Sequence, residues 1–198
     1  MRLFKLLAVL LVVGLVVSVG TMCSDQEQAK PAEVKKSAEK VFSYVGLKKC
    51  KPCHIPHQYN VWKDKSHAKA YEELASEQSL AVAKKLGLKE EPQKSAQCLS
   101  CHVTAYGIAD SLKTAVTLEE GVSCEACHGP GSDYWSMKVM KALSAGTQDP
   151  KAVGLWPQTE EMCVTCHNKK SPTYKPFKFA EAVKAIAHPN PKKEGEKK

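Results

Sequence analysis

Cys50-Lys51-Pro52-Cys53-His54 is the first of four copies of one pattern, Cys-x-x-Cys-His, in a chain of 198 residues. The other copies are Cys98-Leu99-Ser100-Cys101-His102, Cys124-Glu125-Ala126-Cys127-His128 and Cys163-Val164-Thr165-Cys166-His167. Two thiols three positions apart can add to the two vinyl groups on one edge of a porphyrin. The histidine that follows then lies under the iron as its proximal ligand.

This pattern predicts four covalently bound haem c groups. A structural zinc site is the alternative for paired cysteines, but zinc does not require a histidine directly after the second cysteine. A thioredoxin-like redox site needs only one such pair, and no strand-helix-strand pattern surrounds any of the four. We expect attachment at Cys50, Cys53, Cys98, Cys101, Cys124, Cys127, Cys163 and Cys166, with His54, His102, His128 and His167 as proximal ligands.

The N-terminal segment has the form of an export signal. Arg2 and Lys5 accompany an apolar run over residues 6–17, which is short for a membrane span. We expect residues 1–22 to be a signal peptide and the protein to act in the periplasm or on the outer side of a bacterial membrane. The ninth cysteine, Cys23, is a candidate lipid anchor, and the alternatives are loss with the signal or an idle thiol.

The charge balance limits the kinds of partner. The formal net charge is +8, almost entirely from lysine, because Arg2 is the only arginine. Four ferric haems would change it by about −4, since each brings two propionates against one net positive charge. Without arginines for bidentate phosphate contacts or a reader motif, nucleic-acid binding is excluded. The lysines favour steering of an acidic redox partner protein.

The apolar pattern predicts a mainly α fold with little or no sheet, because no stretch alternates over strand length. Residues 44–190 are expected to form one tetrahaem cytochrome c domain, between a flexible tether at 23–43 and a disordered lysine-rich tail at 191–198. The haems themselves must supply much of the core. Thr117 is predicted to begin a helix through a capping box. The other expected helices span 57–86, with a break near Ser76, then 132–146, 159–167 and 176–187.

The histidine count limits the iron ligands. Four irons with two histidines each would need eight imidazoles, and the chain has seven. After the proximal residues only His57, His67 and His188 remain as candidate distal ligands. One iron is therefore open or takes another ligand, and methionine is the alternative. The candidate methionines are Met137, Met140 and Met162.

Several stretches beyond the haem motifs are distinctive. They are Tyr44-Val45-Gly46 before the first motif, Trp62-Lys63, Ser66-His67-Ala68-Lys69-Ala70, and Gly121-Val122-Ser123-Cys124-Glu125-Ala126-Cys127-His128-Gly129-Pro130-Gly131-Ser132. Through these stretches the chain resembles the tetrahaem cytochrome c-554 family over residues 42–188. The resemblance implies a mostly helical fold around closely stacked haem pairs. It also implies periplasmic electron transfer from a hydroxylamine-oxidising enzyme towards the quinone pool or other carriers.

For the irons, the resemblance implies three bis-histidine haems and one five-coordinate haem, with His67 as a distal ligand and the iron above His102 open. Two features depart from the family pattern. The segment between the second and third motifs lacks histidine, and Asp133-Tyr134 stands where related chains often carry a histidine.

Three functions fit these features. An electron carrier is favoured, because four haems in one chain form a relay between redox partners. The first alternative is an enzyme that reduces or oxidises a small nitrogen species, such as nitric oxide, nitrite or hydroxylamine, at one open haem. The second alternative is a subunit of an extracellular haem filament in which each copy lends a histidine to its neighbour.

Overall fold

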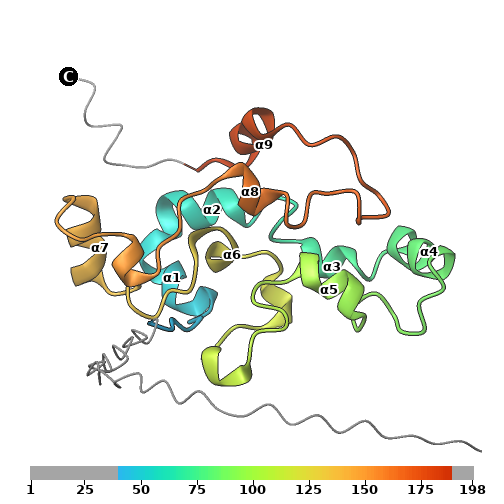
Figure 1. Cartoon of the computed structure of the whole chain (residues 1–198), viewed down its shortest axis with the longest axis horizontal. Helices are drawn as coiled ribbons and strands as arrows, with labels where there is room; N and C mark the ends of the chain where they lie inside the picture. The colour runs from blue at the N-terminus through green and yellow to red at the C-terminus, as the bar shows by residue number, and fades with distance from the viewer. Residues whose placement is uncertain (1–39, 189–198) are drawn as a thin grey trace, which may run out of the picture. The chain divides into compact units, whose positions relative to one another are not determined.

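The computed structural model describes residues 40–188 (Figure 1). The expected signal peptide, Cys23, nearly all of the expected tether and the lysine-rich tail lie outside the described residues. Among the helices of residues 40–188, none combines the length and the apolar character that a membrane crossing requires.

Short helices joined by turns make up the described chain. The α-helices are α1 (Leu47–His54), α2 (Asn60–Trp62), α3 (Ala70–Glu73), α4 (Glu77–Lys85), α5 (Ala96–His102), α6 (Cys124–His128), α7 (Met137–Ser144), α8 (Glu160–Cys163) and α9 (Phe179–Ile186). A π-helical turn at Ile55–Tyr59 joins α1 to α2, and 3-10 turns lie at Asp110–Leu112, Leu118–Glu120 and Lys151–Val153. The only strand-like pairing within 40–188 is an isolated bridge between Tyr44 and Lys113. The mainly α fold class is confirmed.

The helix expected over 57–86 breaks twice rather than only near Ser76. The backbone carbonyl of His67 accepts a hydrogen bond from the Val122 amide at 3.0 Å, so this stretch bonds to a distant segment rather than continuing the helix. The second break is at Ser76, as expected, where the hydroxyl accepts from the Ser79 amide and caps α4. Tertiary contacts therefore override helix propensity here.

Other helix boundaries also differ from those expected. Ser136, not Ser132, caps α7, while the Ser132 hydroxyl accepts from the backbone amide of Ser43. The expected capping box at Thr117 begins only a 3-10 turn, without a side-chain cap. Thr159 caps α8 as expected, but that helix ends at Cys163, before the fourth motif is complete. The expected helix at 176–187 is confirmed as α9, which starts at Phe179.

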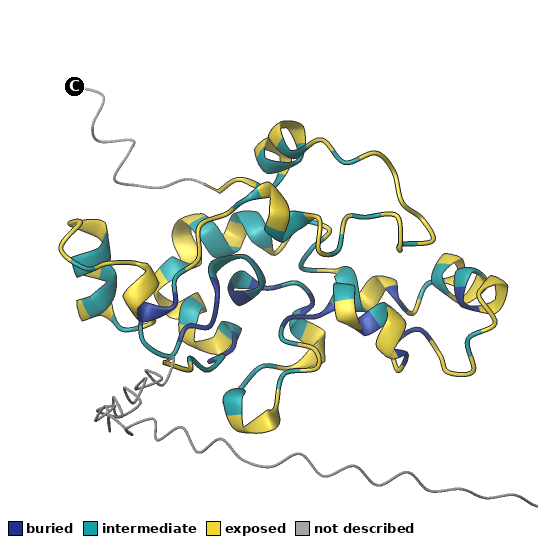
Figure 2. Cartoon of the chain, viewed as in Figure 1, coloured by how far each residue is buried: buried dark blue, intermediate teal, exposed yellow. Residues whose placement is uncertain are grey.

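Few apolar side chains are buried, as Figure 2 shows by its scattered dark-blue segments. Among residues 40–188 the buried hydrophobic residues are Val45, Leu74, Ala83, Leu99, Val103, Tyr134 and Val153. Leu74, Leu99 and Val103 form one cluster beside the second motif, where α3 contacts α5. The polypeptide alone therefore has a small core, as expected for a chain whose cofactors supply apolar volume.

Candidate functional site

Helical backbone shapes three of the four motifs. The first lies in α1, the second in α5, and the third is α6 from end to end. Cysteines at i and i+3 share a helix face with the histidine at i+4, so thiols and imidazole point the same way. In the fourth motif α8 ends at Cys163 and the following residues form a turn. None of the eight motif cysteines is in a disulfide.

Two of the motif histidines have their Nδ1 atoms occupied by oxygen acceptors. His102 Nδ1 lies 2.7 Å from the Ala70 carbonyl, and His54 Nδ1 lies 3.2 Å from Gln58 Oε1. An oxygen acceptor requires the proton on Nδ1, which leaves the Nε2 lone pair for a metal. In the third motif, His128 Nδ1 lies 3.2 Å from the side-chain amide nitrogen of Gln158.

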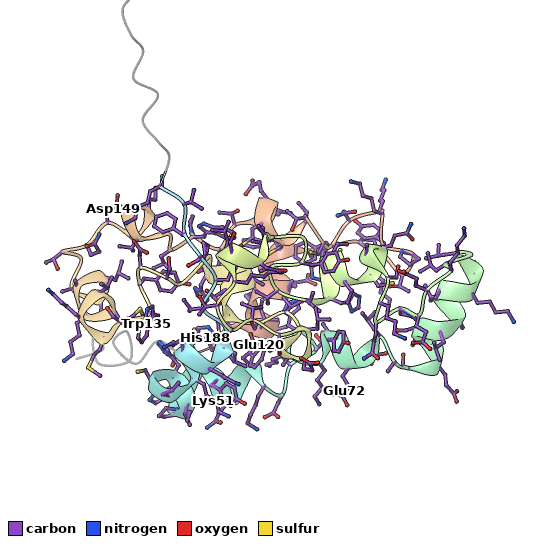
Figure 3. The ribbon with its side chains drawn as sticks, turned by 90° about the horizontal axis from the view of Figure 1, so that it is seen from below. Lys51, Glu72, Glu120, Trp135, Asp149 and His188 are labelled. Carbon is purple, nitrogen blue, oxygen red and sulfur yellow. The ribbon has the colours of Figure 1, made fainter. Side chains whose placement is uncertain are left out.

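The remaining histidines meet the motif histidines in pairs. The ring centroids of His67 and His167 are 5.9 Å apart, and those of His128 and His188 are also 5.9 Å apart. Two imidazoles on opposite sides of one metal have centroids roughly 6 Å apart, because each metal–nitrogen bond is about 2 Å long. Both pairs therefore fit a metal held between two histidines. Figure 3 shows His188 among the side chains at the centre of the described chain.

The neutral imidazole is the form that binds metal, and burial favours that form at His67 and His128. Burial lowers the pKa of His67, and the neighbouring His167 lowers it further. Burial also lowers the pKa of His128 to about 4, with smaller contributions from His188 and His54. The last contribution shows that the first motif lies near the third.

Contacts between thiols give the order of the motifs in space. The neighbouring Cys124 thiol, together with burial, raises the pKa of Cys50, and α1 contacts α6, so the first motif lies beside the third. Burial and the neighbouring Cys163 raise the pKa of Cys127 to about 11, which places the third motif beside the fourth. Burial raises the pKa of Cys166, and the nearby Cys101 adds to the shift. The order is first, third, fourth, second.

The sequence interpretation missed a carboxylate in this region. Glu125, inside the third motif, is 1% exposed and accepts hydrogen bonds from the amides of Val45, Gly46 and Gly131. A signal existed, since Glu125 is the only acidic residue between the two cysteines of any of the four motifs. Its partners lie up to 80 residues away, so the pattern along the chain could not reveal them.

His57 is the one non-motif histidine that the structure does not place against another imidazole among residues 40–188. It is exposed in the π-helical turn after α1. An aromatic ring also lies against His167, where Phe177 stacks on the imidazole with ring centroids 4.9 Å apart. Among the methionine candidates, Met137 is 62% exposed on α7. None of the three methionines is tested as an iron ligand by these contacts.

Short helices around four Cys-x-x-Cys-His segments, paired imidazoles and a small core define a multihaem c-type cytochrome. A family model described as cytochrome c554 and c-prime matches residues 49–129. The chain is 30% identical over 173 residues to cytochrome c-554 of Nitrosomonas europaea, covering 72% of this chain and 73% of that protein. The protein described here belongs to the cytochrome c-554 family.

A solved structure agrees with this assignment. The structure of reduced cytochrome c554 from Nitrosomonas europaea matches with a TM-score of 0.51 and 28% identity. The match covers 80% of this chain and 84% of that chain. This chain is therefore a c-type cytochrome involved in electron transfer, with covalently bound c-type haem as its cofactor and redox proteins as its partners.

Proposed function

We propose that this protein carries electrons between two redox proteins outside the cytoplasm, through four haem c groups attached at the four motifs. Haem supplies reversible one-electron chemistry, and the chain fixes where each group lies. The spatial order of the motifs carries the proposal, because the first and second motifs are the two ends of a continuous series. The apolar run at 6–17 supports a periplasmic location.

Stopped-flow oxidation of the fully reduced holoprotein tests the carrier function. Fast equilibration along the series predicts that all four haems are oxidised together by one oxidant, even when it reaches only one end. Four independent phases that each depend on oxidant concentration would contradict a relay. Mass spectrometry of the same sample counts the attached haems, so a failed attachment is distinguished from slow transfer.

The two histidine pairs support specific axial ligands. In this proposal His67 is the distal ligand for the fourth motif, opposite His167, and His188 is the distal ligand for the third motif, opposite His128. Burial of His67 and His128 favours the neutral imidazole that binds iron. Only His57 then remains for the irons of the first and second motifs.

Replacing His67 with alanine is expected to convert one haem of the four from low-spin to high-spin, because its iron loses the sixth ligand. The change should be visible in electron paramagnetic resonance and in the optical charge-transfer band. His188→Ala should convert a second, different haem. A His67→Ala protein whose spin states match those of the parent would disprove the pairing with His167.

One iron without a second histidine favours a second candidate function. Two pairs use four of the seven histidines, so at least one iron among the first and second motifs lacks a second histidine. Such an iron could bind nitric oxide, nitrite or hydroxylamine and exchange electrons with the other haems. Titration of the reduced holoprotein with nitric oxide should then show one binding site per chain. An entirely low-spin protein that binds none would exclude this function.

The first motif carries the charge that suits an acidic partner. Helix α1 contains Lys48, Lys49 and Lys51 and no acidic residue, and none of these lysines is in an ion pair among residues 40–188. Figure 3 shows Lys51 projecting outward. Lys48 and Lys51 line a hollow of about 380 Å³ beside Trp62. We call these three lysines the α1 lysine group.

The α1 lysine group also lies at an accessible haem-attachment site. Cys53 is the only exposed cysteine among the eight motif cysteines. Lys49 lies over the Trp135 ring at 4.5 Å and Lys51 over the Tyr59 ring at 4.6 Å. These cation–π contacts restrict the motion of the two ammonium groups and keep them close to the first motif. An acidic protein would therefore be steered to this end of the series.

Changing the α1 lysine group to glutamine is expected to slow oxidation of the reduced protein by plastocyanin, an acidic copper protein, by about tenfold at low salt. The rate of the variant should also depend less on ionic strength, because fewer charges steer the encounter. The matched control is Lys84→Gln, Lys85→Gln and Lys89→Gln, which removes the same charge from exposed positions in and after α4. Equal slowing of both variants would show an effect of net charge alone.

A further inference from the structure

Glu125 is the only buried charged side chain among residues 40–188. Its Oε1 accepts from the Val45 amide at 2.9 Å and from the Gly131 amide at 2.6 Å. Its Oε2 accepts from the Gly46 amide at 2.8 Å and lies 3.2 Å from the Val45 amide. Every partner is a donor, so these contacts favour the ionised carboxylate, which only accepts hydrogen bonds.

Within residues 40–188, no cation forms an ion pair with this carboxylate. None of the ion pairs within residues 40–188 includes Glu125. Its hydrogen bonds come from neutral amides, which stabilise the negative charge without cancelling it. A second carboxylate, Glu120, is half-buried nearby and accepts from the Leu47 amide at 3.1 Å. Figure 3 shows Glu120 among the central side chains rather than at the outer edge.

The charge lies where the first and third motifs meet. Glu125 directly follows Cys124 at the start of α6, and α6 contacts α1, which contains the first motif. It also fixes the backbone just before α1, because Val45 and Gly46 lead into that helix. In the second and fourth motifs, by contrast, the two residues between the cysteines are Leu99-Ser100 and Val164-Thr165, which carry no charge. The two motif contacts therefore differ in local charge.

We propose that Glu125 sets the reduction potentials of the haems held by the first and third motifs. This proposal rests on haem attachment at those motifs. A fixed negative charge stabilises ferric iron over ferrous iron, because ferric iron carries one more positive charge. Coulomb's law with an effective dielectric constant of about 20 gives roughly a tenfold effect on reduction for a charge on the order of 10 Å away.

Redox titration of the Glu125→Gln holoprotein tests this role. Glutamine keeps the size of the side chain and removes its charge. Two of the four haems should become easier to reduce by about tenfold each, equivalent to 59 mV for a one-electron couple, and the other two should change much less. Four unchanged potentials, or four equal shifts, would overturn the proposal.

Three further variants separate charge from structure. Glu125→Asp keeps the charge and should leave the potentials closer to those of the parent than Glu125→Gln does. Glu119→Gln removes a charge from a fully exposed carboxylate beside Glu120 and should change none of them. If Glu125→Gln does not fold, Glu120→Gln should still raise the potentials of the same two haems, by a smaller factor. Unmoved potentials in that variant would count against the proposal.

Haem content distinguishes this proposal from the proposed function. Mass spectrometry of each variant reports how many haems are attached. If the first or third motif of the parent protein carries no haem, the proposed four-haem carrier fails. If all four haems are present and Glu125→Gln moves no potential, only the role of Glu125 fails.

Discussion

Replacing Cys163 and Cys166 together with alanine is expected to remove one haem from the protein and to unfold its C-terminal part. No residue from 155 to 188 is buried in the polypeptide alone, so little else holds α8 and α9 in place. The apolar side chains of this part, such as Phe177 beside His167, would lose the porphyrin as their packing surface. His67 and His188 would lose their fixed positions as well.

Hydrogen exchange measured by mass spectrometry checks this expectation. The amides of α8 and α9 should exchange at the rate of an unfolded chain, while those of α4 and α5 should keep their protection. Val164→Ala with Thr165→Ala changes the two intervening residues of the same motif and should keep both the haem and the protection. A double-cysteine variant that lacks the haem but protects α9 as the parent does would show that protein contacts hold this part.

The repeated motif made the cofactor predictable, because its chemistry is local, while the lack of alternating apolar stretches made the fold class predictable. Five consecutive residues contain both thiols and the imidazole, and a helical turn brings them to one face. The small core was also predictable from the length of chain available per haem. The helix at 176–187 was predictable from the spacing of its apolar residues, which needs no knowledge of distant segments.

The pairing of the histidines was not predictable from the residues alone, because it depends on distant contacts. His67 and His167 are a hundred positions apart in sequence, and nothing in the local pattern assigns one to the other. The same limit explains the broken helix over 57–86. The amide of Val122 donates a hydrogen bond to the His67 carbonyl. The indole of Trp62 donates to the Val122 carbonyl at 3.0 Å. A segment far along the chain thereby fixes the backbone of a candidate ligand.

Gly129, which directly follows His128, is expected to tolerate no side chain. Its φ is +81°, and a Cβ there would lie 2.5 Å from the Gly154 carbonyl oxygen and 2.8 Å from the Trp156 ring. The Trp156 amide donates to the His128 carbonyl at 3.0 Å, so moving Trp156 away would break a contact to the candidate ligand. Gly129→Ala should therefore lower the free energy of unfolding by about 3 kcal/mol or more, combining backbone strain with overpacking.

Gly146→Ala is the matched control for Gly129→Ala. Gly146 has a similar φ of +72°, but a Cβ there would meet nothing within 4 Å, so only the backbone strain of about 1 kcal/mol remains. Guanidinium unfolding of the two holoproteins separates these contributions, and exchange of the Trp156 amide reports the lost contact directly. Equal destabilisation by the two substitutions would mean that the segment at 154–156 moves away from a side chain at position 129 at no cost in free energy. In that case the close approach of Trp156 would contribute nothing to holding His128.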